Sequence, residues 1–267
     1  MKKPYVVAAL AAAAALTMSA CANNSGAAAT TPGGVSLVTP GVLTVCTHLA
    51  YKPFQFTEGG KIVGFDVDLM DLVAKKLGVR QEVIDIEFGQ ITSGAAFTAK
   101  KCDAGAAAIT ITPERDKAAP FSTPYFASKQ ALLVKTDSPV TSLSDMKGKV
   151  LSVQTDTSGK VYAEGHEGEF GYSTKVFDDM PTASNAVLAG TVDGTLNDNG
   201  VLLDFARENT STKVVQEIDT NEHYGFNVSK DNPALLSTIN DVLKTAKSDG
   251  TFNTIYKKWF GVDAPAE

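Results

Sequence analysis

Short apolar segments alternate with amphipathic segments from Gly41 onward, and this alternation constrains the fold more strongly than any other feature of the sequence. Residues 65–77 carry apolar side chains at positions 65, 69, 72, 73 and 77, which is the spacing of one buried helix face. Acidic residues stand near the start of this segment, lysines near its end, and Gly78 follows as a C-cap. Strands that alternate with helices favour an α/β fold with largely parallel sheets.

The same criteria place further elements along the chain. They predict strands over residues 42–47, 81–88, 104–112, 150–154 and 194–197, and helices over 91–101, 183–189, 199–208 and 233–260, the last with a break at Asp249-Gly250. A chain of 267 residues is long enough for one large domain or for two lobes of about 100 residues each.

The first residues have the pattern of an export signal. Two lysines precede an apolar run over residues 6–16, which is too short to cross a bilayer but suits a signal peptide. Residues 17–21, Thr-Met-Ser-Ala-Cys, resemble the cleavage site of bacterial lipoproteins, although that pattern prefers Leu, Val or Ile at Met18. We therefore expect removal of residues 1–20 and lipidation of Cys21, which would anchor the exported protein on the extracytoplasmic side of the membrane. The alternative is an ordinary secretory cleavage site.

Residues 21–40 are small, polar and turn-forming, and they show no periodicity. Such composition predicts a flexible tether between the lipid and the folded body. If Cys21 carries lipid, Cys46 and Cys102 remain as a pair in an oxidising compartment. The sequence leaves two alternatives open for this pair, namely a disulfide bond or two buried free thiols.

Composition and motifs argue against several functions. The net charge of −6 offers no basic surface for nucleic acid. The three histidines, His48, His166 and His223, are far apart and not at metal-ligand spacing. The sequence also lacks the nucleophile-elbow, phosphate-loop and dinucleotide-binding motifs. We therefore expect no metal, no cofactor, no nucleic-acid partner and no catalytic residues.

Five collinear stretches of the chain resemble the polar amino-acid-binding proteins of ABC importers, the family-3 extracellular solute-binding proteins. They are residues 51–56 (YKPFQF), 64–69 (GFDVDL), 109–115 (ITITPER), 121–125 (FSTPY) and 250–261 (GTFNTIYKKWFG). The resemblance implies a two-lobed, type II periplasmic-binding-protein-like fold, in which each lobe is a mostly parallel sheet flanked by helices and a two-strand hinge joins the lobes. Lobe 1 would comprise residues 41–127 and 224–267, and lobe 2 residues 128–223.

The resemblance also implies which residues hold the α-carboxylate of an amino acid. A carboxylate that loses water in a closing cleft needs charged or hydrogen-bonding partners. Arg115 stands where the family's carboxylate-binding arginine is expected, and its planar fork suits that group. The alternative for Arg115 is a surface residue in the first turn of a helix. Thr110 would add its backbone N–H and its hydroxyl, and Ser158 would begin a helix whose free N–H groups favour an anion.

The α-ammonium would be held by two further residues. Asp198 is at the position that pairs with the ammonium in relatives, although an aspartate there could equally be a helix N-cap. Ala108 stands where the family usually has glycine, and its carbonyl would accept from the ammonium. Because these contacts come from both lobes, ligand binding would shift the population toward a closed cleft that a permease recognises.

The side chain of the ligand would meet four residues. Tyr51 and Phe88 match the two aromatics that sandwich the ligand in relatives; the alternative for each is core packing. His48 is a departure, because relatives that take glutamine or basic amino acids usually carry Asp there. A histidine suits an amide or a carboxylate, and Gln154 is also uncharged. We therefore expect a neutral polar or acidic amino acid; the alternative is a His48 turned out of the pocket.

These features together predict a monomeric, non-enzymatic substrate-binding protein that delivers a polar amino acid to the permease subunits of an ABC importer. One alternative is an enzyme on the same fold, similar to the cyclohexadienyl dehydratases, with Glu87 or Asp156 as its acid. A second alternative is a ligand-sensing module that docks on a partner receptor.

Overall fold

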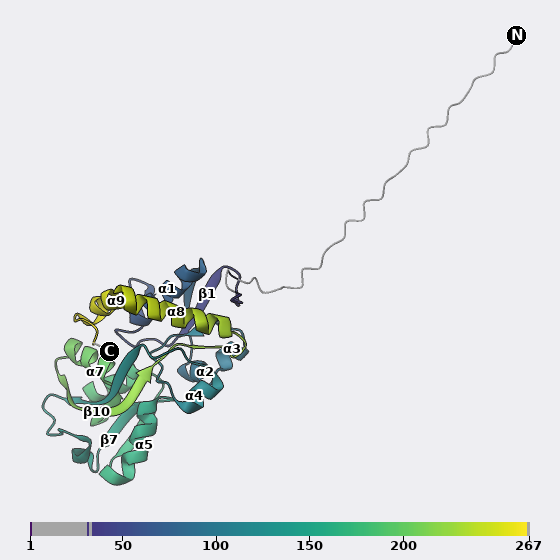
Figure 1. Ribbon diagram of the computed structural model, residues 1–267. Helices are drawn as coiled ribbons and strands as arrows, with labels where there is room; N and C mark the ends of the chain where they lie inside the picture. The colour runs from purple at the N-terminus through teal and green to yellow at the C-terminus, as the bar shows by residue number, and fades with distance from the viewer. Residues whose placement is uncertain (2–30, 32–33, 266–267) are drawn as a thin grey trace.

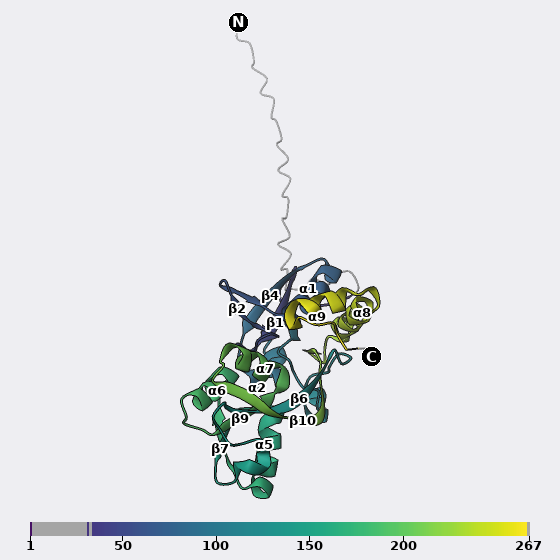
Figure 2. The ribbon, with the colours of Figure 1, turned by 90° about the vertical axis from the view of Figure 1, so that its left-hand side faces the viewer.

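The structure is a computed structural model that describes residue 1, residue 31 and residues 34–265. The predicted signal peptide beyond its first residue, the predicted lipidation site at Cys21 and most of the predicted tether lie outside the described residues. Two large β-sheets organise the described chain, which crosses from one to the other and back (Figures 1 and 2). Among the described residues, no helix has the length and apolarity that a membrane span needs.

Four strands form the sheet of the first lobe, which we define as this sheet together with the helices and hairpin around it. They are β1 (Val42–Thr47), β4 (Arg80–Asp85), β5 (Ala104–Gly105) and β11 (Asn227–Val228), in the order β11-β5-β1-β4. β1 is parallel to β4 and β5, whereas β11 is antiparallel to β5. Every residue of β1 is buried, as expected for a central strand covered on both faces.

Helices α1, α8 and α9 of the first lobe pack against one another (Figure 1). The helices of this lobe are α1 (Phe65–Leu77), α2 (Phe88–Thr92), α3 (Ala95–Thr98), α4 (Pro113–Ala118), α8 (Pro233–Asp249) and α9 (Thr251–Phe260), and its hairpin is β2 (Phe56–Glu58) with β3 (Lys61–Val63). Rings from distant motifs meet in the core: Phe65 lies 5.2 Å from Phe260 and 6.2 Å from Phe54, between ring centroids. The aromatic rings of residues 250–261 therefore complete the core around residues 51–56, which precede α1, and residues 64–69, which begin it.

Five strands form the sheet of the second lobe. They are β6 (Phe126–Lys135), β7 (Val150–Gln154), β8 (Ser173–Phe177), β9 (Gly194–Asp198) and β10 (Thr212–Tyr224), in the order β10-β6-β9-β7-β8. The helices are α5 (Ser158–Phe170), α6 (Met180–Leu188) and α7 (Asn199–Glu208), with a short 3-10 helix over Leu143–Met146. β7 is parallel to β8 and β9, but the long strands β6 and β10 run antiparallel to their neighbours. β6 leaves the first lobe and β10 returns to it, so the crossover strands supply the antiparallel half of this sheet.

Most predicted elements agree with the structure, and two differ in an informative way. The predicted helix over 91–101 is split into α2 and α3, because Gly94 adopts a left-handed conformation with φ of 75°. The predicted strand over 104–112 ends at Gly105, and Ala108 farther along has a φ of 49°, which is incompatible with an extended strand. This turn brings residues 108–110 into the cleft described below.

The residues from Val35 onward do not behave as the flexible tether that the sequence predicts over 21–40. Val35 and Leu37 are 0% and 2% exposed in the core of the first lobe. The backbone N–H of Val38 donates to Oδ1 of Asp103 at 2.7 Å, and Asn232 donates to the carbonyl of Ser36 at 2.7 Å. The two buried apolar side chains and the two hydrogen bonds thus fasten this segment to the folded body.

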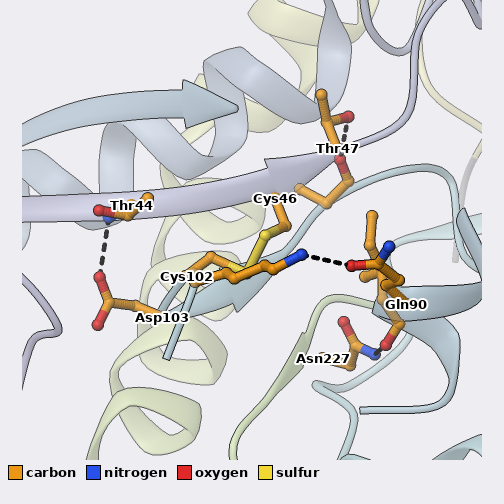
Figure 3. The surroundings of a disulfide bond; sticks show 10 residues. Thr44, Cys46, Thr47, Gln90, Cys102, Asp103 and Asn227 are labelled. Atoms are coloured by element: carbon orange, nitrogen blue, oxygen red, sulfur yellow. Dashed lines mark hydrogen bonds between the residues drawn. A yellow bond between two sulfur atoms is a disulfide. The ribbon is translucent and has the colours of Figure 1, made fainter. Parts of the chain in front are cut away.

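The structure joins Cys46 and Cys102 in a disulfide with an S–S distance of 2.09 Å and a Cα–Cα distance of 5.7 Å. Figure 3 shows the bond between β1 and the segment that leads into β5, next to Asp103. Asp103 accepts a hydrogen bond from the backbone N–H of Thr44 at 2.9 Å (Figure 3). The covalent bond and the hydrogen bond hold the same two segments of the first lobe together.

Candidate functional site

A cavity with about 340 Å³ of unfilled space, part of it open to solvent, lies between the two lobes. All nine residues that we expect from the sequence to bind the ligand line this cavity: Arg115, Asp198, Thr110, Ala108, Tyr51, Phe88, His48, Gln154 and Ser158. Gln55, Ala107 and Thr157 also line it, and the sequence predicts no role for them. Neither Glu87 nor Asp156, the two acids considered for an enzyme, is among the lining residues.

Arg115 lies in the first turn of α4, which Thr112 caps by accepting from the backbone N–H of Arg115 at 3.1 Å. Its Nη1 donates to the carbonyl of Thr110 at 2.9 Å, and its Nη2 donates to the carbonyl of Asp156 in the second lobe at 2.7 Å. The guanidinium also lies 5.4 Å from the centre of the Phe88 ring. Arg115 is therefore held in the cleft, and its alternative as a solvent-facing surface residue is wrong.

Burial lowers the pKa of Arg115, whereas the carboxylates of Asp198 and Glu222 raise it. Both guanidinium hydrogen bonds described above go to backbone carbonyls, which leave the positive charge without a bonded carboxylate. A half-buried cation in this state is stabilised by an anion that enters the cleft.

Asp198 closes β9 and is 6% exposed. It precedes α7 in the N-cap position, but its side chain makes no capping hydrogen bond. Its Oδ1 accepts from Nε2 of Gln130 at 2.6 Å, and its Oδ2 bonds to the hydroxyls of Tyr51 (2.9 Å) and Tyr224. Burial, and then repulsion by Glu222, raise the pKa of Asp198 to about 6. A bound cation would stabilise its charged form.

Glu222 contacts the site although it is absent from the sequence-based candidates. Its Oε2 accepts from Nε2 of Gln130 at 2.9 Å, from Oγ of Ser158 at 3.2 Å and from Oγ1 of Thr110 at 3.4 Å. A glutamate two residues before the predicted return point at Tyr224 was the one signal that could have identified it. Glu222 links the hinge strand β10 to hydroxyls of both lobes.

Asp66 orients the backbone at Ala108. Its Oδ2 accepts from the N–H of Ala108 at 2.8 Å, and its Oδ1 accepts from the hydroxyl of Tyr125 at 2.8 Å. Asp66 is fully buried, and this burial raises its pKa to about 7. Because the N–H of Ala108 is bonded to Asp66, its carbonyl is the backbone group of Ala108 that remains for a ligand.

His48 lies inside the cleft, with 14% of its side chain exposed. Its Nδ1 is 2.9 Å from the carbonyl oxygen of Ile86, and its ring centre is 6.2 Å from that of Phe88. The alternative of a His48 turned out of the pocket is therefore wrong.

Several contacts join the lobes across the cavity, so the cleft is closed in this structure. Besides the bond from Arg115 to Asp156, the hydroxyl of Tyr51 bonds to Oδ1 of Asn197 at 2.6 Å. At the rim, Lys52 forms an ion pair with Glu208. Within the described part of the chain, no group of three or more His, Cys, Asp or Glu residues is placed to hold a metal ion.

Two α/β lobes, a pair of crossover strands and a closed polar cleft define a bacterial solute-binding protein of the type II periplasmic fold. The chain belongs to the bacterial extracellular solute-binding proteins, family 3, whose profile matches residues 43–262. It is 37% identical over 214 residues to the ABC transporter glutamine-binding protein GlnH of Bacillus subtilis, covering 78% of this chain and 76% of that protein.

Solved structures agree with this assignment. An ancestral arginine-binding protein bound to arginine is 39% identical with a TM-score of 0.78, covering 82% of this chain and 98% of the other. An ancestral amino-acid-binding protein described as a precursor of cyclohexadienyl dehydratase is 34% identical with a TM-score of 0.76, covering 82% and 96%.

Proposed function

We propose that this protein captures an amino acid in the cleft between its lobes and delivers it to the permease of an ABC importer. The observation that carries this proposal is a pair of opposite charges, Arg115 and Asp198, which line one cavity without bonding to each other. An α-amino acid is a zwitterion, so its two charged groups complement both residues at once.

The α-carboxylate would bind at Arg115, whose guanidinium offers a planar fork. Ser158 is the first residue of α5, so its backbone N–H is one of the unpaired donors of that helix start. Thr110 lies beside it, with its hydroxyl oxygen 3.3 Å from that of Ser158. The α-ammonium would bind at Asp198 and at the carbonyl of Ala108, and its charge would lower the raised pKa of Asp198.

Closure would provide the signal for transport. Arg115 belongs to the first lobe, and Asp198 and Ser158 belong to the second, so the ligand meets its full set of partners only when the lobes approach. Ligand binding would therefore shift the population toward the closed form, which the permease recognises.

We further propose that the protein acts as a monomer without catalytic turnover, and that lipid on Cys21 anchors it to the membrane outside the cytoplasm. The membership of an extracellular family supports export. The absence of Glu87 and Asp156 from the residues lining the described cavity argues against the dehydratase alternative. Consumption of prephenate or arogenate by the protein would contradict the proposal.

A thermal-shift screen of the ligand-free protein against the twenty amino acids tests the capture of an amino acid. A ligand at 100 times its dissociation constant should add about 2.7 kcal/mol to the free energy of unfolding. Arg115→Ala should abolish the response to every amino acid. Arg80→Ala is the matched control, because Arg80 is an exposed residue of the same lobe paired with Glu82. A wild-type protein that responds to none of the twenty would refute the proposed function.

A further inference from the structure

We infer that the cleft selects an amino acid whose side chain ends in a carboxamide, and that it rejects acidic and cationic side chains. This inference rests on the proposed function and concerns the part of the cavity that the α-carboxylate and α-ammonium do not use. Three buried side chains with unpartnered polar atoms in the described structure carry it: two acceptors, Nε2 of His48 and Oε1 of Gln55, and the amide of Gln154. All three residues line the cavity.

The backbone decides the role of each nitrogen of His48. A carbonyl oxygen only accepts hydrogen bonds, so the 2.9 Å contact with the carbonyl of Ile86 requires that Nδ1 of His48 carries the proton. In the neutral tautomer with its proton on Nδ1, Nε2 has a lone pair and no proton. Because this nitrogen is buried and unpartnered, it requires a donor from whatever fills the cavity.

Gln55, which is 1% exposed, presents a second acceptor of this kind. Its amide would be ambiguous without a partner, but the carbonyl of His48 lies 3.3 Å from its Nε2 and accepts from it. Oε1 is therefore the free atom of this amide, and it also requires a donor. The bond to His48 further shows that these two acceptors belong to the same end of the cavity.

Gln154 is 3% exposed and approaches the cavity from the second lobe. Unlike His48 and Gln55, its amide has no carbonyl partner among the described residues that fixes its orientation. It can therefore present an N–H group as well as an oxygen to the ligand. A carboxamide offers two N–H donors for the acceptors and one oxygen that can accept from Gln154.

Charge distinguishes a carboxamide side chain from acidic and cationic side chains as a ligand for this cavity. An acidic side chain presents only acceptor oxygens to Nε2 of His48 and Oε1 of Gln55. Neither of these two buried atoms then gains a hydrogen bond, and the ligand oxygens gain none from them. A cationic side chain has the donors, but a buried cation needs an anion. Asp198 is the one acidic residue that lines the described cavity, and the α-ammonium uses it. Asp85 lies 4.0 Å from His48, but on the Nδ1 side of the ring.

Isothermal titration calorimetry with glutamine, asparagine, glutamate, arginine and alanine tests this inference. Glutamine and glutamate have nearly the same shape, so their comparison isolates the exchange of an NH₂ donor for an acceptor. We expect glutamine or asparagine to bind at least about 100-fold more tightly than glutamate and arginine. Equal or tighter binding of glutamate or of arginine would overturn the inference and leave the proposed function intact. Binding of no amino acid would overturn both.

Two variants locate the effect in the acceptors. His48→Phe and Gln55→Leu each remove one acceptor, and each should weaken binding of the carboxamide ligand about tenfold or more while leaving alanine nearly unaffected. His166→Phe is the matched control, because His166 stacks on Tyr162 at 4.1 Å outside the lining of the cavity. Urea unfolding of each variant checks that it is folded. A preference for the carboxamide that survives in both folded variants would contradict the role of the acceptors.

Discussion

The carboxylate of Asp66 accepts a hydrogen bond from the backbone N–H of Ala108, at 2.8 Å, and thereby ties helix α1 to a residue that lines the cleft. Ala108 is held with a φ of 49°, which is uncommon for a residue with a Cβ. The same carboxylate accepts from Tyr125, so two neutral donors and no cation surround it. The aspartate in the GFDVDL motif thus serves the site indirectly, through the backbone that it orients.

Asp66 should make the stability of the protein depend on pH. Its pKa is raised by burial to about 7 from 3.8, so the folded state binds this proton more tightly than the unfolded state. The stabilisation is therefore fully present below pH 4 and is lost as the pH rises through about 7. The loss is on the order of 4 kcal/mol.

Urea unfolding of wild type and Asp66→Asn from pH 4 to 8 measures this contribution. The variant should lack that part of the pH dependence, because its amide does not ionise. Asp71→Asn, at a half-exposed position of the same helix paired with Lys75, is the control and should follow the wild type. Parallel curves for wild type and Asp66→Asn would contradict the prediction.

Gly89→Ala should hinder closure of the cleft. A Cβ at Gly89 would lie 2.4 Å from Oδ2 of Asp156, in the opposite lobe, so the clash arises only when the lobes approach. Because Oδ2 is the far end of an exposed side chain that can turn aside, we expect amino-acid affinity to fall only about threefold, with little change in the stability of the ligand-free protein. The double variant Gly89→Ala/Asp156→Ala should recover most of the affinity in calorimetry, because it removes the atom that clashes. Additive losses in the double variant would exclude this explanation.

Removal of the disulfide should lower stability without changing the ligand. The bond spans a sequence separation of 56 residues, and Cys46 and Cys102 are both buried. We expect Cys46→Ala/Cys102→Ala to lower the free energy of unfolding by about 2–4 kcal/mol. Urea unfolding measures the loss, and calorimetry should find the same order of preference among amino acids. A mass unchanged by reduction and alkylation of the wild type would show that the bond does not form.

The rim ion pair between Lys52 and Glu208 should matter little. The two side chains are 38% and 52% exposed, so water and salt screen their attraction. Lys52→Met should change amino-acid affinity less than about fivefold, which corresponds to less than about 1 kcal/mol. A loss of tenfold or more at 150 mM salt would show that the pair controls closure.

Local patterns in the sequence predicted those elements that local interactions determine. Helix α1 runs from Phe65 to Leu77 as its apolar spacing predicts, and Gly78 ends it in the left-handed conformation. Helix α7 and strand β7 also have their predicted bounds. The strand predicted over 104–112 fails because a contact with Asp66, 42 residues away from Ala108 in the chain, decides the backbone there.

The residues of the candidate site likewise fall into two groups, those that the sequence predicts and those that it does not. The resemblance predicts Arg115, which lies in the stretch ITITPER, and Asp198, which lies outside the five stretches and is predicted from its position in the relatives. Glu222 and Gln55 were missed, because neither has a role that can be recognised without its spatial neighbours. Glu222 reaches Ser158 across 64 residues of sequence, and no pattern within β10 indicates that contact.

The sequence by itself determined the α/β class, the family and the residue types that can bind a zwitterion. The class depends on local periodicity, and the family and the residue types depend on collinear motifs. Only the tertiary structure decided how those residues present their atoms. His48 illustrates the difference: the sequence allowed it to face an amide or an acid. The carbonyl of Ile86, 38 residues away, assigns a proton to Nδ1, so that in the neutral ring Nε2 is the acceptor. The direction of a hydrogen bond depends on the group at its other end, and folding brings that group into place.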